Sequence, residues 1–203
     1  MIEKIVENYS LTVDNVTGNI EIKKKSKELP LLYELKLPAL EKGTLALLDK
    51  VRENLVAHVP IKTSELLDIA ATEPIKDKFY AQGLEVIKSE LPNIDEKVQN
   101  HLIGLIIHEM LGLGKLEMLL ADGRLEEIAI NGASDPVWVY HKKYGWLKTN
   151  IIVPSELEIV NYAMSIGRRV GRQITVLNPL MDAHLITGDR VNATLFPIST
   201  RGN

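Results

Sequence analysis

One stretch of the sequence carries residues of the types that bind phosphate. Gly114-Lys115 matches the end of a phosphate-binding loop, in which backbone N–H groups and a lysine hold the phosphates. That loop also needs a glycine five residues before Gly114 and a serine or threonine after the lysine. Glu109 and Leu116 stand at those positions. Residues 1–203 therefore contain no phosphate loop of this type.

The histidines are the other candidates for chemistry. His108-Glu109 begins like the helix of a zinc protease, but that motif needs a second histidine where the chain has Gly112. We therefore expect His108 to be a buried histidine with a structural role. The remaining histidines have no ligand spacing: His58, His101, His141 and His184. No serine stands in a Gly-x-Ser-x-Gly motif either, so the sequence predicts neither a metal site nor a self-contained active site.

Composition narrows the class of protein. The 203 residues include 24 Lys and Arg, 27 Asp and Glu, and no cysteine, for a net charge of −3. The lack of cysteine excludes disulfides and thiolate metal sites and fits a reducing compartment. A nearly balanced charge argues against a dedicated nucleic-acid-binding protein. No apolar run approaches the roughly 18 residues that span a bilayer. We therefore expect a cytoplasmic globular protein without a nucleic-acid partner.

Hydrophobic periodicity divides the chain into three regions. Residues 1–42 are expected to be extended, with a possible hairpin that turns at Thr17-Gly18. Residues 43–95 have a helical period and form a helical subdomain. Its expected helices, continuing into the next region, are 43–57, 64–71 and 94–112. Between the last two, Pro74 stands where a first helical turn tolerates it, and the apolar stripe continues until Pro92. The last of these should begin with a capping box of Asn93 and Glu96 and end at Gly112 and Gly114.

Residues 96–203 are expected to form a small α/β domain. The expected strands are 127–132, 137–141, 146–152, 174–176, 181–186 and 190–196. A helix starting at Pro154-Ser155, with Glu158 completing a capping box, separates the first three strands from the rest. This order predicts an antiparallel sheet with a helix on one face. The expected fold class is therefore α+β, an N-terminal helical subdomain followed by a small antiparallel-sheet α/β domain of PAS-like form.

An ordered set of short motifs runs through this last region. They are Leu111–Leu120, Leu125–Gly132, Val137–Tyr140, Gly171–Ile174, Asn178–Leu185 and Gly188–Ala193. In this order and spacing the set resembles the N-terminal domain of type II/type IV secretion ATPases. It is most similar to the branch with the archaeal archaellum and pilus motor ATPases. The resemblance covers roughly residues 96–203, and the helical stretch before it is similar to the N-terminal extension of the archaeal members.

The resemblance implies a longer parent protein. In that family a RecA-like domain follows and carries the phosphate loop, the acidic metal-binding residues and a histidine box, none of which occurs in residues 1–203. We therefore expect a parent ATPase motor that uses ATP and Mg²⁺, whereas residues 1–203 alone are not catalytic and need no cofactor. The sequence stops soon after its last expected strand, which fits either such a boundary or a natural frayed end.

The resemblance also implies a role for two arginines. By motif position, Arg172 and Arg190 correspond to arginines that reach the nucleotide phosphates from the side opposite the phosphate loop. A guanidinium is permanently charged, and its planar fork matches phosphate oxygens. Arg168 and Arg169 are near enough in sequence to be confused with Arg172. The alternative is that these arginines are only solvated side chains on turns.

The resemblance implies partners as well. Family members assemble as homo-hexamers and work with a polytopic membrane platform protein and accessory cytoplasmic proteins, at the inner face of the cell membrane. An alternative is a stand-alone protein–protein interaction adaptor without nucleotide chemistry. A further alternative is single-stranded nucleic-acid binding through Lys142, Lys143, Trp146 and Arg168–Arg172, against which the acidic net charge argues. Trp138, Tyr140 and Trp146 alternate along strands and are expected to pack in the core or in an interface.

Overall fold

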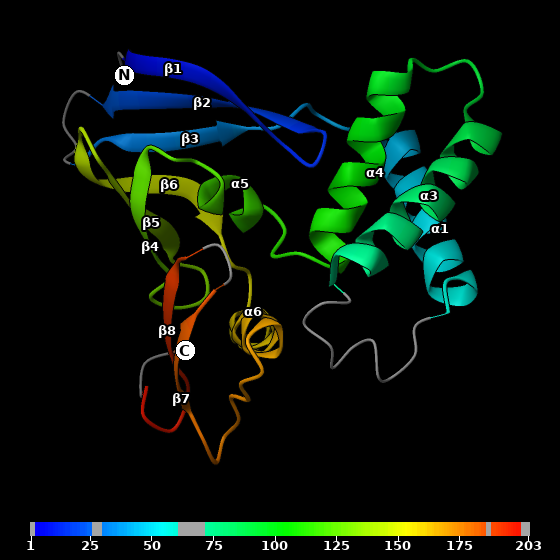
Figure 1. The fold of residues 1–203 in the computed structure, drawn as a ribbon. Coiled ribbons are helices and arrows are strands. Elements are labelled where there is room, and N and C mark those ends of the chain that lie inside the picture. Colours follow the sequence, from blue (N-terminus) through cyan, green and yellow to red (C-terminus); the bar gives the residue numbers. More distant parts are fainter. Residues whose placement is uncertain (1–2, 26–29, 61–71, 186–187, 200–203) are drawn as a thin grey trace.

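The structure, a computed structural model, describes residues 3–25, 30–60, 72–185 and 188–199 and has an α+β fold (Figure 1). A six-stranded sheet holds the main core, and a bundle of three helices lies to one side of it. A long helix and a two-stranded hairpin form the C-terminal part. The expected fold class, α+β, is confirmed.

The chain begins with a long β-hairpin. Strands β1 (Glu3–Val13) and β2 (Val16–Lys25) pair antiparallel with Val13 opposite Val16. Asp14 and Asn15 form the turn, with φ angles of 47° and 66°. Two-residue hairpin loops favour positive φ at both positions, which Asp and Asn tolerate. The turn expected at Thr17-Gly18 was therefore wrong, because both of these residues lie within β2.

The six strands of the main sheet follow the order β1-β2-β3-β6-β5-β4. The four strands beyond the hairpin are β3 (Leu32–Lys36), β4 (Leu125–Ala129), β5 (Pro136–His141) and β6 (Gly145–Ile152). β3 runs parallel to β6, and the other neighbours are antiparallel. The sheet is therefore mixed, whereas an antiparallel sheet was expected. The N-terminal strands β1, β2 and β3 belong to the same sheet as the strands of residues 125–152. The helices between β3 and β4 form the crossover connection between these two sets of strands.

Three helices form the bundle beside the sheet. They are α1 (Lys42–His58), α3 (Thr72–Glu90) and α4 (Glu96–Met110). Leu55, Phe79 and Ile103 are buried where the helices meet, one from each helix. The helices expected at 43–57 and 94–112 are thus confirmed, and the segment 64–71 lies outside the described residues. α4 begins with Asp95, whose carboxylate accepts a hydrogen bond from the Lys97 N–H at 2.7 Å, and not with the expected capping box.

A short helix that the sequence pattern did not predict follows α4. Gly114 has a φ of +58° and its N–H donates to the His108 carbonyl at 2.8 Å, so only the second of the two expected glycines takes the left-handed conformation. The chain then forms α5 (Leu116–Leu120), whose Met118 and Leu119 are buried in the main core under the sheet. Five residues give too short a periodicity to recognise from sequence.

The C-terminal part forms a unit with its own small core. Helix α6 (Glu156–Arg169) begins with the expected cap, because the Ser155 hydroxyl accepts a hydrogen bond from the Glu158 N–H at 3.2 Å. Strands β7 (Leu180–His184) and β8 (Arg190–Thr194) form a separate two-stranded sheet, and no strand occurs at the expected 174–176. The inward residues of the hairpin pack with α6 in a cluster that includes Ala163, Met181 and Leu195. A single sheet containing all strands was therefore the wrong expectation.

Candidate functional site

Arg190 and Asp182 form a paired fork on the exposed face of the β7–β8 hairpin. The Arg190 Nε donates to Asp182 Oδ1 at 2.9 Å, and Nη2 donates to Oδ2 at 2.8 Å. In the hairpin register His184 lies opposite Arg190, and Asp182 lies opposite Asn192, so the fork is diagonal. Two parallel N–H···O bonds are the geometry in which guanidinium binds carboxylate or phosphate.

The electrostatics of the fork involve two further side chains. The hydrogen bonds from Arg190 hold the pKa of Asp182 below its ordinary value, and the charges of Arg190, His184 and Arg172 lower it further. The same fork raises the pKa of the Arg190 guanidinium. Both side chains stay accessible, with 61% of Arg190 and 52% of Asp182 exposed. The hairpin therefore places Arg190 on one exposed carboxylate, with His184 opposite Arg190 in the register.

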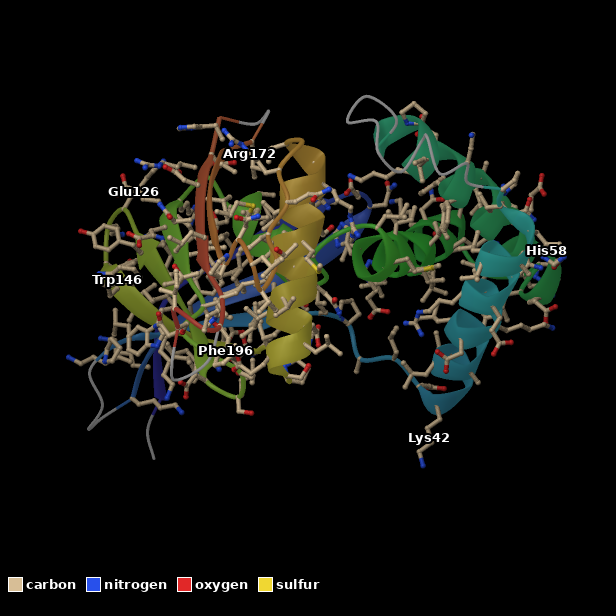
Figure 2. All side chains as sticks on the ribbon, turned by 90° about the horizontal axis from the view of Figure 1, so that it is seen from below. Lys42, His58, Glu126, Trp146, Arg172 and Phe196 are labelled. Atoms are coloured by element: carbon tan, nitrogen blue, oxygen red, sulfur yellow. The ribbon has the colours of Figure 1, made fainter. Side chains whose placement is uncertain are left out.

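Two glycines position Arg172. Gly171 has a φ of +65°, and the Arg172 N–H donates to the Gly167 carbonyl at 2.8 Å. A Cβ on Gly167 would lie only 2.9 Å from the Arg172 carbonyl oxygen. The chain therefore folds back tightly over the end of α6, which brings Arg172 beside the hairpin (Figure 2).

The structure also separates Arg172 from its sequence neighbours. The Arg169 guanidinium donates to the Leu111 carbonyl at 3.0 Å and lies 3.4 Å from Glu117, so it is fixed at the other side of α6. Arg168 is exposed on the helix. Of the two arginines that the motif order indicated, Arg190 contacts Asp182, and the charge of Arg172 makes the smallest contribution to lowering the pKa of Asp182. Asp182 lies within β7.

A second polar cluster surrounds the buried carboxylate of Asp122. The hydroxyls of Tyr9 and Tyr33 donate to its Oδ2 at 2.5 and 2.8 Å, and the Arg124 N–H donates to Oδ1 at 3.0 Å. Burial raises the pKa of both tyrosine hydroxyls, and the Asp122 carboxylate adds to the effect. The sequence pattern did not indicate this cluster, because its members come from three segments far apart in the sequence: β1, β3 and the loop before β4. Three donors satisfy one carboxylate here, which is typical of a structural site.

Glu7 on β1 adds further polar contacts to this cluster. Its carboxylate accepts hydrogen bonds from Arg124 at 2.6 Å, from Tyr144 at 2.7 Å and from Lys143 at 3.2 Å. These bonds, led by that from Tyr144, lower the pKa of Glu7. The Arg124 guanidinium also lies 3.6 Å from the centre of the Tyr9 ring. The edge strand β1 is thereby joined to the loop before β4 and to the β5–β6 turn, so the cluster stabilises a curved sheet.

Two buried histidines have defined surroundings. His108 is 4% exposed and its Nε2 lies 3.3 Å from Asp14 Oδ2, which agrees with the structural role expected for it. His141 is 3% exposed and its Nδ1 accepts a hydrogen bond from the Lys143 N–H at 3.0 Å. Its Nε2 has no hydrogen-bond partner, and burial lowers its pKa. Among the described residues, no three His, Cys, Asp or Glu side chains form a group suited to a metal ion.

Two aromatic residues of the β5–β6 pair lie on the outer face of the sheet. Tyr140 and Trp146 meet edge to face with ring centres 5.5 Å apart, and they are 36% and 42% exposed. The expected core packing was therefore wrong for these two residues, and packing in an interface stays a prediction. Figure 2 shows Trp146 and Arg172, two of the residues considered for single-stranded nucleic acid, on different parts of the surface.

The end of the hairpin away from the fork is apolar. Phe196 marks this end in Figure 2, and Arg172 marks the other. Five apolar side chains here are more than half exposed: Val176, Leu177, Leu180, Phe196 and Ile198. We call them the hairpin-end patch. Exposed apolar groups gathered in this way are typical of surfaces that contact another protein segment.

No family model matches the chain. Three uncharacterized proteins of Methanocaldococcus jannaschii are similar to it. The first is 33% identical over 158 residues, which are 78% of this chain and 61% of the relative. The second is 31% identical over 201 residues, 98% of this chain but 26% of the relative, and the third is 30% identical over 121 residues, 60% and 22% respectively. The chain thus spans less than two thirds of the length of each of these curated relatives.

No helix in the described ranges is long and apolar enough to cross a bilayer.

Proposed function

We propose that residues 1–203 are the N-terminal assembly and regulatory part of a hexameric motor ATPase of the type II/type IV secretion class, nearest in motif to the archaellum and pilus motors. One observation carries this proposal. Arg190, which the motif resemblance assigns to the nucleotide phosphates, holds the Asp182 carboxylate through two parallel hydrogen bonds. A guanidinium that binds a carboxylate in this way has the geometry that phosphate binding requires.

In this proposal the arginines act on a nucleotide bound by another domain. ATP and Mg²⁺ bind to the RecA-like domain of the parent protein, and closure of the cleft brings Arg190 and Arg172 to the phosphates. A guanidinium that reaches the γ-phosphate only in the closed state stabilises the charge that develops during transfer. Closure is then coupled to the nucleotide state. Residues 1–203 alone supply no phosphate loop and do not hydrolyse ATP.

The proposal extends to the arrangement of parts. The bundle of α1, α3 and α4 serves as the helical subdomain that meets the polytopic platform protein and accessory cytoplasmic proteins at the inner face of the membrane. The region from α5 to β8 serves as the PAS-like domain, to which β1, β2 and β3 contribute part of the sheet. The separate apolar core of the bundle supports a distinct role for it. The boundaries at 42/43 and 95/96 remain predictions.

The coding sequence beyond Asn203 provides the first test. A phosphate-loop domain following in frame supports the motor. The complete gene product should then hydrolyse ATP with Mg²⁺, whereas residues 1–203 alone should not. In that product Arg190→Ala should abolish turnover while hexamer formation and the thermal midpoint are kept. Turnover by residues 1–203 alone, or full activity in the folded Arg190→Ala protein, would contradict the proposal.

The hairpin-end patch favours a second candidate, a stand-alone interaction adaptor. Its five exposed apolar side chains come from the segment that leads into β7, from the start of β7 and from the segment that follows β8, and such a surface suits contact with another protein. In an adaptor Arg172 and Arg190 would be solvated surface residues. A stop codon directly after Asn203 would favour the adaptor, and a phosphate-loop sequence there would favour the motor.

A further inference from the structure

We infer that Asp182 is an internal competitor for phosphate at Arg190: its carboxylate occupies the guanidinium fork that a phosphate group would bind, and the anion must displace it. The inference rests on the proposed function in one respect, because it takes the ligand to be the phosphates of a nucleoside di- or triphosphate. It adds a positioning and regulating role for Asp182 that the motif resemblance does not assign.

The occupied fork is the first observation. Nε and Nη2 lie on one edge of the guanidinium, and both donate to Asp182, at 2.9 and 2.8 Å. A phosphate presents two oxygens in a similar arrangement and uses the same edge of an arginine. The two ligands therefore exclude each other at that edge. When Asp182 holds that edge, the Arg190 guanidinium is kept on the exposed face of the hairpin.

The accessibility of the pair is the second observation. More than half of each side chain is exposed, and exposed ion pairs of this kind contribute little stability because water screens them. Exchange of carboxylate for phosphate then needs only side-chain rotation. A buried ion pair would hold Arg190 permanently. This exposed pair keeps the Arg190 guanidinium oriented, and a phosphate can still displace the Asp182 carboxylate from it.

The surrounding charge is the third observation. Arg172 and His184 also act on Asp182, so the carboxylate offsets part of the positive charge at this end of the hairpin. A phosphate that enters meets the repulsion of Asp182 until the carboxylate turns away. Removing that negative charge should therefore strengthen anion binding for two reasons, the free fork and the lost repulsion.

The backbone around the pair is held in place. Met181 and Ala183 alternate with Asp182 and are buried against α6, so the strand cannot rotate about its axis. Gly188, with a φ of +94° in the connection between the strands, lets the chain turn back so that Arg190 pairs with His184. Asp182 and Arg190 are thus set by a paired hairpin, and the competition between carboxylate and phosphate follows from its register.

The test is a titration of the 203-residue protein with inorganic pyrophosphate at low ionic strength, followed by calorimetry and by the NMR signal of the Arg190 Nε–H group. Asp182→Asn should bind pyrophosphate about two- to fivefold more tightly than the original chain, the range that corresponds to a surface ion pair. Arg190→Gln should lose the binding. Arg190→Lys, which keeps the charge without the fork, should bind more weakly than the original.

Asp49→Asn is the matched control. Asp49 is also exposed and pairs with Arg52, on α1, so this variant changes the net charge by the same amount away from the hairpin. Its pyrophosphate affinity should equal that of the original chain. The Arg190 Nε–H signal should shift in Asp182→Asn without ligand, and in the original chain only when pyrophosphate is added. Equal thermal midpoints show that the variants are folded.

Three results would overturn the inference. They are equal pyrophosphate affinities of Asp182→Asn and the original chain, equal gains in affinity in Asp182→Asn and Asp49→Asn, or no measurable pyrophosphate binding to Asp182→Asn or the original chain. These results are separable from the test of the proposed function. Loss of ATP turnover in Arg190→Ala with no effect of Asp182→Asn would keep the motor and remove the competitor. Tighter pyrophosphate binding in Asp182→Asn with a stop codon after Asn203 would keep the competitor and remove the motor.

Discussion

The Nε2 atom of His108 in α4 lies 3.3 Å from the Asp14 carboxylate in the turn between β1 and β2. The same turn approaches α4 at Gly104, where an added Cβ would lie 2.4 Å from the Asp14 carbonyl oxygen. The Thr17 N–H also donates to His101 Nδ1 at 3.4 Å. The hairpin turn therefore rests directly on the helix, and this contact joins the sheet to the helical bundle.

Gly104→Ala should lower the free energy of unfolding by about 1–3 kcal/mol, the usual cost of overpacking a tight contact. The clash would be with the Asp14 backbone, which cannot rotate away as a side chain can. Urea unfolding followed by circular dichroism measures the change. Gly43→Ala is the control, since a Cβ there meets nothing within 4 Å, and it should be neutral or slightly stabilising. Equal stabilities of the two variants would show that the turn does not rest on α4.

The stability of the chain should fall in mild acid because of His141. Burial holds the folded pKa of His141 below the ordinary value of 6.5, so the unfolded chain binds a proton more readily than the folded one. The contribution of His141 is therefore complete above pH 6.5 and is lost as the pH falls from 6.5 toward the folded pKa. Urea unfolding at pH 7.5 and at pH 5.5 measures the loss.

His141→Gln should reduce this pH dependence, because its amide oxygen can still accept the Lys143 N–H but takes up no proton. The exposed His58 is the matched control, and His58→Gln should keep the slope of the original chain. An unchanged slope in His141→Gln would assign the acid sensitivity to other groups.

Asp122→Asn should destabilise the fold by about 1–3 kcal/mol, the cost of a buried polar group left without its partner. The buried carboxylate accepts hydrogen bonds from Tyr9, Tyr33 and the Arg124 N–H, and it uses both of its oxygens. In asparagine only the amide oxygen can accept, so the side chain cannot replace all three bonds. The midpoint of urea unfolding gives the change. Tyr9→Phe removes one donor and leaves the carboxylate with the other two, so it should cost less. A larger loss in Tyr9→Phe than in Asp122→Asn would show that Asp122 is not the centre of the cluster.

Local features of the sequence predicted local features of the structure. The helix expected at 43–57 appears as Lys42–His58, and the Ser155 cap forms as expected. The strands at 137–141 and 146–152 are also present. All of these depend on residues a few positions apart, whose spacing is read directly from the chain. Arg172 and Arg190 were named from motif order, and the structure shows a contact with Asp182 for Arg190.

Only the tertiary structure decided which elements are partners. The parallel pairing of β3 with β6, the separate β7–β8 sheet, the Asp122 cluster and the fork between Asp182 and Arg190 all join residues whose contact the sequence pattern did not indicate. A strand pattern shows which face is buried but not which strand lies beside it. That choice depends on how helices and sheet together bury apolar surface and satisfy polar groups. The sequence by itself determined where most helices and strands form, and packing over the whole chain determined their neighbours and the side chains that meet at the site.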